Sequence, residues 1–307
     1  MEFRQIQYFV CLYEEGSVTR AARRLNIVQP ALSMQIAKLE EEIGKALFVR
    51  NPKGMEPTSE ARRMYRLFLP VLGDYARARE QVLQTTSELS GQVRIGMIES
   101  LAQGVLVDAL LEFSDRHPKV ELSLTDGFSG TLTDAVSVGQ LDAAIINKPR
   151  RSLALMTEPI AEEDLLLVTG PNFAPMPDSV PFKQLADIKL VLPSRRHGLR
   201  GILESFAEAE DVMLQPSVEL DSISAILILV GRSDFGTVLP RVAVRGPLQR
   251  GEVQGYLLKA PRVSRQLICV THPRRPLSPA ALAFVSTLIK HIRAINEELA
   301  LDSRDTV

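Results

Sequence analysis

The sequence predicts an α/β protein in two parts, a mostly helical amino-terminal module with a β-wing and a larger carboxyl-terminal α/β domain. Two observations predict this division. Apolar residues recur at helical spacing through the first 90 residues, whereas beyond Gly91 they gather in short runs separated by helical segments. A chain of 307 residues is also long enough for two or three domains.

Residues 17–43 read as two short helices joined by a tight turn, which is how helix-turn-helix modules are built. At about 100° per residue, four apolar side chains of the second helix fall on one face and predict a buried stripe: Leu32, Ile36, Leu39 and Ile43. The opposite face is short and mostly small, so it fits a major groove. A helical hairpin of an ordinary core is the alternative.

Basic residues favour the DNA-binding interpretation. Residues 17–66 hold ten Lys or Arg and five acidic residues, an excess of five, although the whole chain has 36 basic and 37 acidic residues. Positive charge is therefore concentrated beside the two helices, where a phosphate backbone would attract it.

A β-wing and a long helix are expected next. The segment LFVRNPKGMEPT combines a strand-like run with a Pro-Lys-Gly turn and basic residues. From Thr58 to about Ser87, seven apolar positions alternate spacings of three and four and predict a dimerising coiled-coil seam: Ala61, Met64, Phe68, Val71, Tyr75, Ala78 and Val82. Packing of this helix on its own domain is the alternative.

Beyond the helix, short apolar runs alternate with helical segments, as in a parallel α/β sheet. The expected strands are Val93–Met97, Val120–Leu124, Ala143–Ile146, Leu165–Val168, Leu190–Leu192, Val218–Leu220, Thr237–Leu239 and Leu267–Val270. The expected helices between and after them include Leu101–Arg116, Gly198–Glu210, Ser222–Val230 and Pro279–Leu299.

Several classes of protein are disfavoured by composition. The start, MEFRQIQYFV, lacks the pattern of a signal peptide, and the longest clean apolar run, Ala225–Val230, is too short to cross a bilayer. Cys11 and Cys269 lie far apart, which suits a reducing cytosol. Four histidines show no metal-ligand spacing. We therefore expect a cytoplasmic protein with no membrane segment, metal or cofactor.

The segment YFV…EEGSVTRAARRLNIVQPALSMQIAKLEEEIGKALFVR…PT resembles the signature of LysR-type transcriptional regulators. The segments SGQVRIG, GQLDAAII and DLLLV are consistent with it, and the resemblance covers essentially the whole chain. It implies a winged helix-turn-helix (1–58), a dimerising linker helix with a hinge (59–90), a periplasmic-binding-protein-like effector domain (91–300) and a tail (301–307). The effector domain would have two lobes, lobe I (91–162 and 267–300) and lobe II (163–266).

The resemblance also implies partners and a function. The protein would regulate transcription by binding a promoter palindrome in double-stranded DNA and bending it. A small-molecule effector between the lobes would modulate that binding. The family assembles as a homodimer through the linker helix and usually as a homotetramer of two dimers.

Nine residues are expected at the DNA. Gln29, Ser33 and Met34 would contact base edges, and Pro30 would start the helix that carries them. The candidates for phosphate contacts are Thr19, Arg20, Lys38, Arg50 and Lys53. Two positions depart from the family pattern, since Val28 cannot cap the helix and Met34 often has a polar counterpart. We expect Met34 to contact either a thymine methyl group or the sugar–phosphate backbone.

Ten residues are expected at the effector site, because binding-protein folds hold ligands at the carboxyl ends of strands. They are Glu99, Ser100, Ser129, Asn147, Ser194, Arg195, Arg196, His197, Phe235 and Gly236. Serines and basic groups at helix starts suit a small organic anion. Capping of helices is the alternative role of the serines, and Glu99 would pair with an arginine or with an amino group of a zwitterionic effector.

Other functions fit less well. A ligand-independent DNA-binding regulator remains open, and a solute receptor would leave the basic module unexplained. For an enzyme, Gly127-Phe-Ser-Gly130 is not a Gly-x-Ser-x-Gly elbow, and no phosphate-binding glycine loop appears. His197 near Ser194 could mimic a nucleophile and its base, but a basic loop at a helix start explains both more simply. We expect no catalysis.

Overall fold

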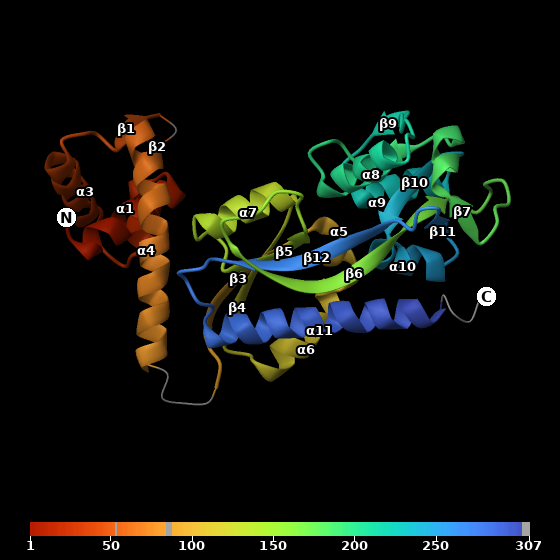
Figure 1. The fold of residues 1–307 in the computed structure, drawn as a ribbon. Helices are drawn as coiled ribbons and strands as arrows, with labels where there is room; N and C mark the ends of the chain where they lie inside the picture. Colours follow the sequence, from red (N-terminus) through yellow and green to blue (C-terminus); the bar gives the residue numbers. More distant parts are fainter. Residues whose placement is uncertain (53, 84–87, 303–307) are drawn as a thin grey trace. The chain divides into compact units, whose positions relative to one another are not determined.

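The computed structural model describes the secondary structure of residues 1–52, 54–83 and 88–302 (Figure 1). By its internal contacts the chain divides into two compact units, residues 1–86 and, apart from the turn 138–140, residues 87–307. The first unit holds one hydrophobic core and the second holds two.

The first unit is a helical module with a hairpin and a long helix: α1 (Phe3–Glu15), α2 (Val18–Arg24), α3 (Gln29–Ile43), β1 (Phe48–Asn51), β2 (Gly54–Pro57) and α4 (Ser59–Leu83). The two helices expected within residues 17–43 are present as α2 and α3. The Ser17 hydroxyl accepts a hydrogen bond from the Arg20 N–H at the start of α2, 3.5 Å away. Gly16 and Gly44 end α1 and α3 with φ of 58° and 72°, the left-handed conformation that suits glycine.

Helix α4 only partly follows the predicted seam. Ala61 and Met64 are buried in the core of the first unit, and Phe68 packs against that core. Val71 is 45% exposed, and Tyr75 is 50% exposed with its ring against Phe3, 4.4 Å between centroids. The exposed part of the seam therefore begins about three turns into the helix. The side chain of Val82 lies outside the described residues. The first half of the pattern thus reflects packing of α4 on its own unit.

The second unit alternates strands and helices: β3 (Gly91–Met97), α5 (Glu99–Gly104), α6 (Leu106–Arg116), β4 (Val120–Asp126), α7 (Ser129–Ser137), β5 (Ala143–Asn147), β6 (Met156–Thr169), β7 (Ser179–Pro181), η1 (Phe182–Asp187), β8 (Val191–Leu192), α8 (Gly198–Ala209), β9 (Val218–Glu219), α9 (Ile223–Gly231), β10 (Gly236–Pro240), α10 (Arg241–Gln249), β11 (Gln254–Lys259), β12 (Ser264–Thr271) and α11 (Pro279–Asp302). All eight predicted strands are present, with shifted ends.

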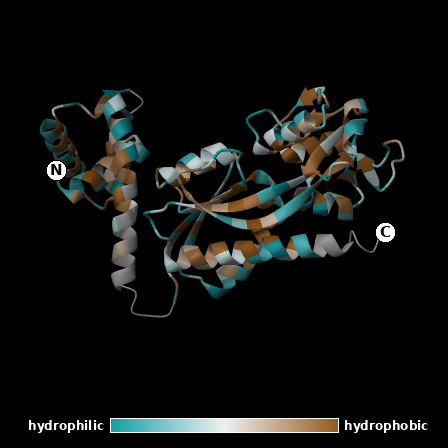
Figure 2. Cartoon of the chain, in the orientation of Figure 1, coloured by the Kyte–Doolittle hydropathy of each residue, from teal (hydrophilic) through white to brown (hydrophobic). Residues whose placement is uncertain are grey.

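Two long strands join the lobes of this unit. β12 pairs with β5 on one side and with β6 on the other, while the second half of β6 pairs with β10 and β11. We call β6 and β12 the crossover strands (Figure 1). Helices α11 and α6 cover one face of the lobe I sheet, and α7 covers the other. Apolar stretches run along the central strands in Figure 2, consistent with one core in each lobe.

The expectation of a parallel sheet is wrong in part. β3 pairs in parallel with β4 and β5, but β12 is antiparallel to both of its neighbours, so the sheet is mixed. The expected helix Leu101–Arg116 is broken at Val105 into α5 and α6. A β-carbon on Gly104 would lie 2.5 Å from the Val242 carbonyl oxygen, so glycine there permits α10 to pack closely on α5.

Candidate DNA-binding surface and effector site

Helix α3 presents its apolar stripe to the core, as predicted for three of the four positions. Leu32, Ile36 and Leu39 are buried, but Ile43 is 37% exposed. Ile43 is the last residue of the helix, before Gly44 turns the chain away, and this position explains the difference. Val28 precedes the helix and makes no side-chain capping bond, as expected.

The opposite face of α3 is open to solvent. Met34 is 63% exposed, which excludes core packing as its role. The other predicted contact residues on and before this helix are exposed as well: Thr19, Arg20, Gln29, Pro30, Ser33 and Lys38. Arg20 on α2 forms an ion pair with Glu15 at the end of α1, 3.5 Å away, which holds its side chain near α1.

The wing is a two-stranded hairpin anchored to both neighbouring elements. The Met55 N–H donates to the Gly16 carbonyl oxygen at 2.9 Å. Glu40 on α3 accepts hydrogen bonds from the N–H groups of Leu47 and Phe48, at 2.6 and 3.1 Å. One carboxylate therefore fixes the wing against α3, a role that sequence reasoning missed. Arg50 is exposed on β1, and Lys53 lies outside the described residues.

A buried arginine marks the place where the two lobes meet. The Arg265 side chain on β12 is fully buried and pairs with Glu163 on β6, with Nη2 2.7 Å from Oε2. Its Nη1 donates to Ser100 Oγ at 3.0 Å and to Asn147 Oδ1 at 3.3 Å. Glu163 also accepts the Val242 N–H at 2.7 Å. We call this region the lobe junction.

Two predicted residues bring unsatisfied polar atoms to the lobe junction. Ser129 Oγ and Asn147 Nδ2 are buried and have no hydrogen-bond partner among the described residues. A β-carbon on Gly198 would lie 3.2 Å from both Ser129 Oγ and Asn147 Nδ2, so the start of α8 faces these two atoms. Buried polar groups without partners are rare in native proteins and point to an absent one.

His197 caps α8 at the same place. Its Nδ1 accepts the Leu199 N–H at 3.2 Å, and its ring meets Phe128 edge-on at 5.8 Å between centroids. Burial lowers the pKa of His197 below its ordinary value, while Asp221 opposes this shift. Asp221 itself accepts the Ser194 N–H at 2.9 Å. The neutral imidazole is thus the form that the fold favours.

Glu99 joins the two lobes directly. Its carboxylate on α5 accepts the Ile223 N–H at the start of α9, 3.0 Å away. Burial raises the pKa of Glu99, and the Ile223 N–H opposes that rise. A carboxylate at a helix start is electrostatically favourable. Glu99 therefore holds the lobes together, and no arginine pairs with it among the described residues.

The other predicted residues are dispersed. Arg196 lies over the Phe128 ring, 5.4 Å from its centroid, and so stays near the lobe junction. Arg195 is 79% exposed and pairs with Glu204. Phe235 and Gly236 were expected in the cleft. Gly236 begins β10 opposite Thr169, whereas the Val242 N–H that reaches Glu163 lies on α10, which follows the other end of that strand. The expectation for these two residues stays a prediction.

Acidification will destabilise the effector domain through His197. Its folded pKa lies below the unfolded value of about 6.5, so the unfolded chain takes up a proton first. Stability is therefore complete above that value and falls as the pH drops below it. A protonated Nδ1 cannot cap α8, which costs about 1 kcal/mol. Urea unfolding between about pH 7.5 and 5.5 measures the loss, and His197→Asn, which caps without titrating, should lose less.

Comparison with known proteins identifies both units. Residues 3–62 match the family model described as a bacterial regulatory helix-turn-helix protein of the lysR family. Residues 86–293 match the model of the LysR substrate binding domain. The chain belongs to the LysR family. As a LysR-family transcriptional regulator, it carries a DNA-binding helix-turn-helix unit followed by an effector-binding domain.

Relatives of this LysR-family protein extend along its whole length. It is 29% identical to the nitrogen assimilation regulatory protein nac of Klebsiella aerogenes, over 99% of this chain and 100% of that protein. The HTH-type transcriptional regulator CzcR of Bacillus subtilis is 28% identical over 95% of this chain and 98% of CzcR. These relatives are regulators, as predicted.

Solved structures share the fold. A full-length OxyR variant from Pseudomonas aeruginosa has a TM-score of 0.76 at 24% identity, covering 95% of each chain. CbnR complexed with its target DNA has a TM-score of 0.55 at 19% identity, covering 95% of this chain and 99% of CbnR. Across the described part of the LysR-family chain, no helix is long and apolar enough to cross a membrane. No cluster of metal-ligating side chains is found there either.

Proposed function

We propose that a small organic anion binds at the lobe junction and thereby modulates binding and bending of promoter DNA. One observation carries this proposal. Two buried polar atoms of lobe I, on Ser129 and Asn147, lie without partners among the described residues beside Arg265 and the start of α8 in lobe II.

Charge at the junction favours an anion over a cation. Glu163 is already neutralised by Arg265, and Glu99 already accepts the Ile223 N–H. A hydroxyl, an amide N–H₂ and the N-terminus of α8 can together satisfy a carboxylate. Arg196, which lies over Phe128, supplies positive charge close by. The effector would thus contact lobe I through Ser129 and Asn147 and lobe II through the start of α8.

We propose separate roles for the exposed residues of the first unit. Gln29, Ser33 and Met34 would contact base edges in the major groove, because all three are exposed in the first two turns of α3 and Met34 lies opposite the buried stripe. Arg50 and Lys38 would contact phosphates, with Thr19 and Arg20 beside them. The positive charge of this unit would make binding strongly salt-dependent.

Oligomerisation is proposed through the free part of α4. Leu67, Val71 and Tyr75 are exposed apolar side chains on a helix whose other face is already packed. A second copy of the helix would cover them and produce a dimer with two recognition helices. Two such dimers would form the tetramer, which suits an interrupted palindrome.

A footprint of the purified protein on the DNA upstream of its own gene tests the regulator and its effector together. We expect a protected palindrome with half-sites about one helical turn apart. One member of a panel of small organic acids should shorten or shift the protection. Protection that ignores every acid would support the ligand-independent alternative, and no specific protection would contradict the DNA-binding assignment at that site.

Gly198→Ala will weaken the response to the effector. The new methyl group would lie 3.2 Å from both Ser129 Oγ and Asn147 Nδ2 and occupy the space between them. We expect the acid concentration at half response to rise roughly threefold to tenfold, about 1 kcal/mol. Gly201→Ala is the matched control, because it lies on the same helix with no atom within 4 Å of its β-carbon. Equal responses from both variants would contradict the placement of the effector between Gly198, Ser129 and Asn147.

Met34→Arg will change base preference at one or two positions of the operator. The residue is exposed at the groove-facing side of α3, and arginine favours guanine where an apolar side chain favours a thymine methyl group. Selection of bound sequences from a random library measures the change, with Ala37→Arg on the same exposed face as the control for added charge. An unchanged motif would assign Met34 to the sugar–phosphate backbone.

A further inference from the structure

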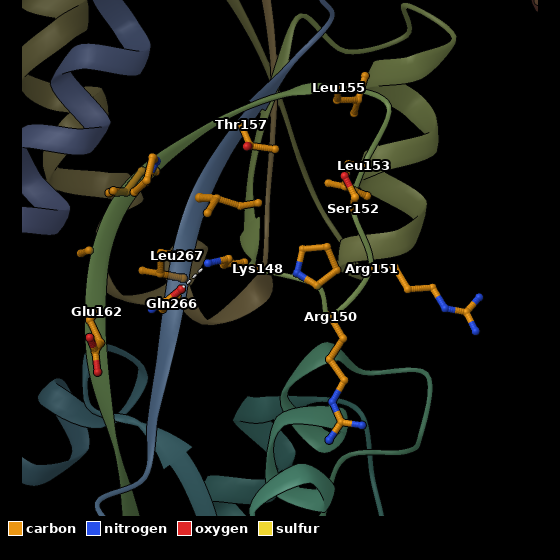
Figure 3. Close-up of a pocket in the computed structure, with 15 residues that line it drawn as sticks. Lys148, Arg150, Arg151, Ser152, Leu153, Leu155, Thr157, Glu162, Gln266 and Leu267 are labelled. Atoms are coloured by element: carbon orange, nitrogen blue, oxygen red, sulfur yellow. Dashed lines mark hydrogen bonds between the residues drawn. The ribbon is translucent and has the colours of Figure 1, made fainter.

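A second pocket lies behind the crossover strands, away from the lobe junction. The loop 148–155, which connects β5 to β6, stands off from residues 157–162 of β6 and 266–268 of β12 and encloses about 820 Å³ (Figure 3). That volume is within the range of small-molecule sites in proteins. Gln266 lines this pocket, whereas the side chain of its neighbour Arg265 reaches the lobe junction.

The lining of this pocket combines an aliphatic wall with a basic rim. Leucine and isoleucine side chains form the wall: Leu153, Leu155, Ile160, Leu267 and Ile268. Lys148, Arg150 and Arg151 contribute three positive charges against the single carboxylate of Glu162. Glu162 already accepts a hydrogen bond from Ser264 at 2.6 Å. The net charge of the lining is therefore positive.

Lys148 is the natural anchor for a ligand. Its backbone N–H donates to the Gln266 carbonyl oxygen at 2.8 Å, which fixes its position at the end of β5. Its ammonium group donates to the Gln266 side-chain oxygen at 2.8 Å, a neutral partner inside the pocket (Figure 3). A carboxylate would be a stronger partner, because charge-assisted pairs are roughly twice as strong as neutral ones.

Arg150 can turn to the same ligand at little cost. It points toward lobe II, where its guanidinium lies 3.8 Å from Glu208 on α8 (Figure 3). Both side chains are largely exposed, so this pair contributes little to stability. Arg151 points outward and adds positive potential at the rim.

We propose that this pocket binds a carboxylic acid with an aliphatic body, and that its occupancy biases the relative position of the two lobes. The body would rest on the leucine and isoleucine wall while the carboxylate pairs with Lys148 and Arg150. The ligand would contact both crossover strands, which also carry Glu163 and Arg265 on the other side. If the ligand of this pocket changes the affinity of the lobe junction for its effector, the effector changes the affinity of this pocket by the same factor. Binding here does not depend on the effector site proposed above.

Calorimetric titration of the full-length protein with cyclohexanecarboxylate tests the proposal. We expect the acid to bind the wild-type protein and to bind Lys148→Met at least tenfold more weakly, since a hydrogen bond to a charged group contributes about 1.5–3 kcal/mol. The neutral cyclohexanecarboxamide should likewise bind at least tenfold more weakly. Lys183→Met removes an exposed lysine of η1 outside the pocket and should bind like wild type.

Two results would overturn the proposal. One is no binding of the acid to the wild-type protein, and the other is equal affinity for wild type and Lys148→Met. In the second case, loss of binding in Gly198→Ala would show that the acid occupies the lobe junction. Arg150→Met provides an independent second variant, for which we expect a smaller loss of affinity. Failure of the footprint to respond to acids would leave these binding measurements unaffected.

Discussion

Arg265→Met will lower the free energy of unfolding of the effector domain by about 3–5 kcal/mol, the usual cost of breaking a buried ion pair. The substitution removes the partner of Glu163 and leaves a carboxylate almost fully buried, with the Val242 N–H as its remaining hydrogen-bond donor among the described residues. It also removes the donor that Ser100 and Asn147 share. Urea unfolding followed by circular dichroism measures the loss, since the chain has no tryptophan to report by fluorescence.

A double variant distinguishes the buried charge from simple loss of packing. Replacing both partners, Arg265→Met with Glu163→Leu, removes the unpaired charge and should recover most of the lost stability. Glu163→Leu alone should cost several kcal/mol, because it leaves the buried guanidinium without its carboxylate partner. If the double variant were as unstable as the sum of the single ones, the ion pair would not be the cause of the loss.

Gly54→Ala will destabilise the DNA-binding unit by about 3 kcal/mol, close to a hundredfold in its folding equilibrium. Gly54 has φ of +132°, and a β-carbon there would lie 2.4 Å from the Gly16 carbonyl oxygen. That oxygen is the acceptor for the Met55 N–H, which anchors the wing. The hairpin must therefore move away from the helix-turn-helix, and we expect affinity for operator DNA to fall along with stability.

Gly44→Ala separates backbone strain from collision in that experiment. Gly44 also has a positive φ, +72°, but a β-carbon there would have no atom within 4 Å. Strain alone should cost about 1–2 kcal/mol. Thermal unfolding and operator titration of both variants give the comparison. Equal losses in the two variants would mean that contact of the wing with Gly16 contributes nothing.

The amino-terminal module could be predicted well because its signals are local. Helical spacing located α3 and its buried stripe, and the ends of the helices are set by capping chemistry that acts within a few residues, as at Ser17 and Gly44. The seam on α4 was predicted too long, since Ala61 and Met64 satisfy a coiled-coil pattern and a core pattern equally well. Which surface covers a residue depends on tertiary contacts that periodicity does not contain.

The candidate effector site was predicted in part, for a similar reason. Strands followed by polar residues located Ser100, Ser129 and Asn147, and the structure brings these three close to the lobe junction. Ser194 instead lies against Asp221. Arg265 was missed because a charged residue inside a strand reads as solvent-facing. The sequence indicates a buried ion pair only if Arg265 is considered together with Glu163, an acidic residue in another apolar strand. Their pairing depends on the antiparallel register of β6 and β12, which the sequence does not show.

The crossing of the chain between lobes has a consequence for synthesis on the ribosome. Lobe I needs β12 and α11, which are made last, whereas the DNA-binding unit is complete within the first 86 residues. Domains generally fold as units while the chain emerges. A message broken before β12 would therefore yield a protein that reaches its operator but lacks Arg265 and half of its lobe junction. Such a fragment would occupy the promoter without responding to any effector, and would act dominantly over the intact regulator.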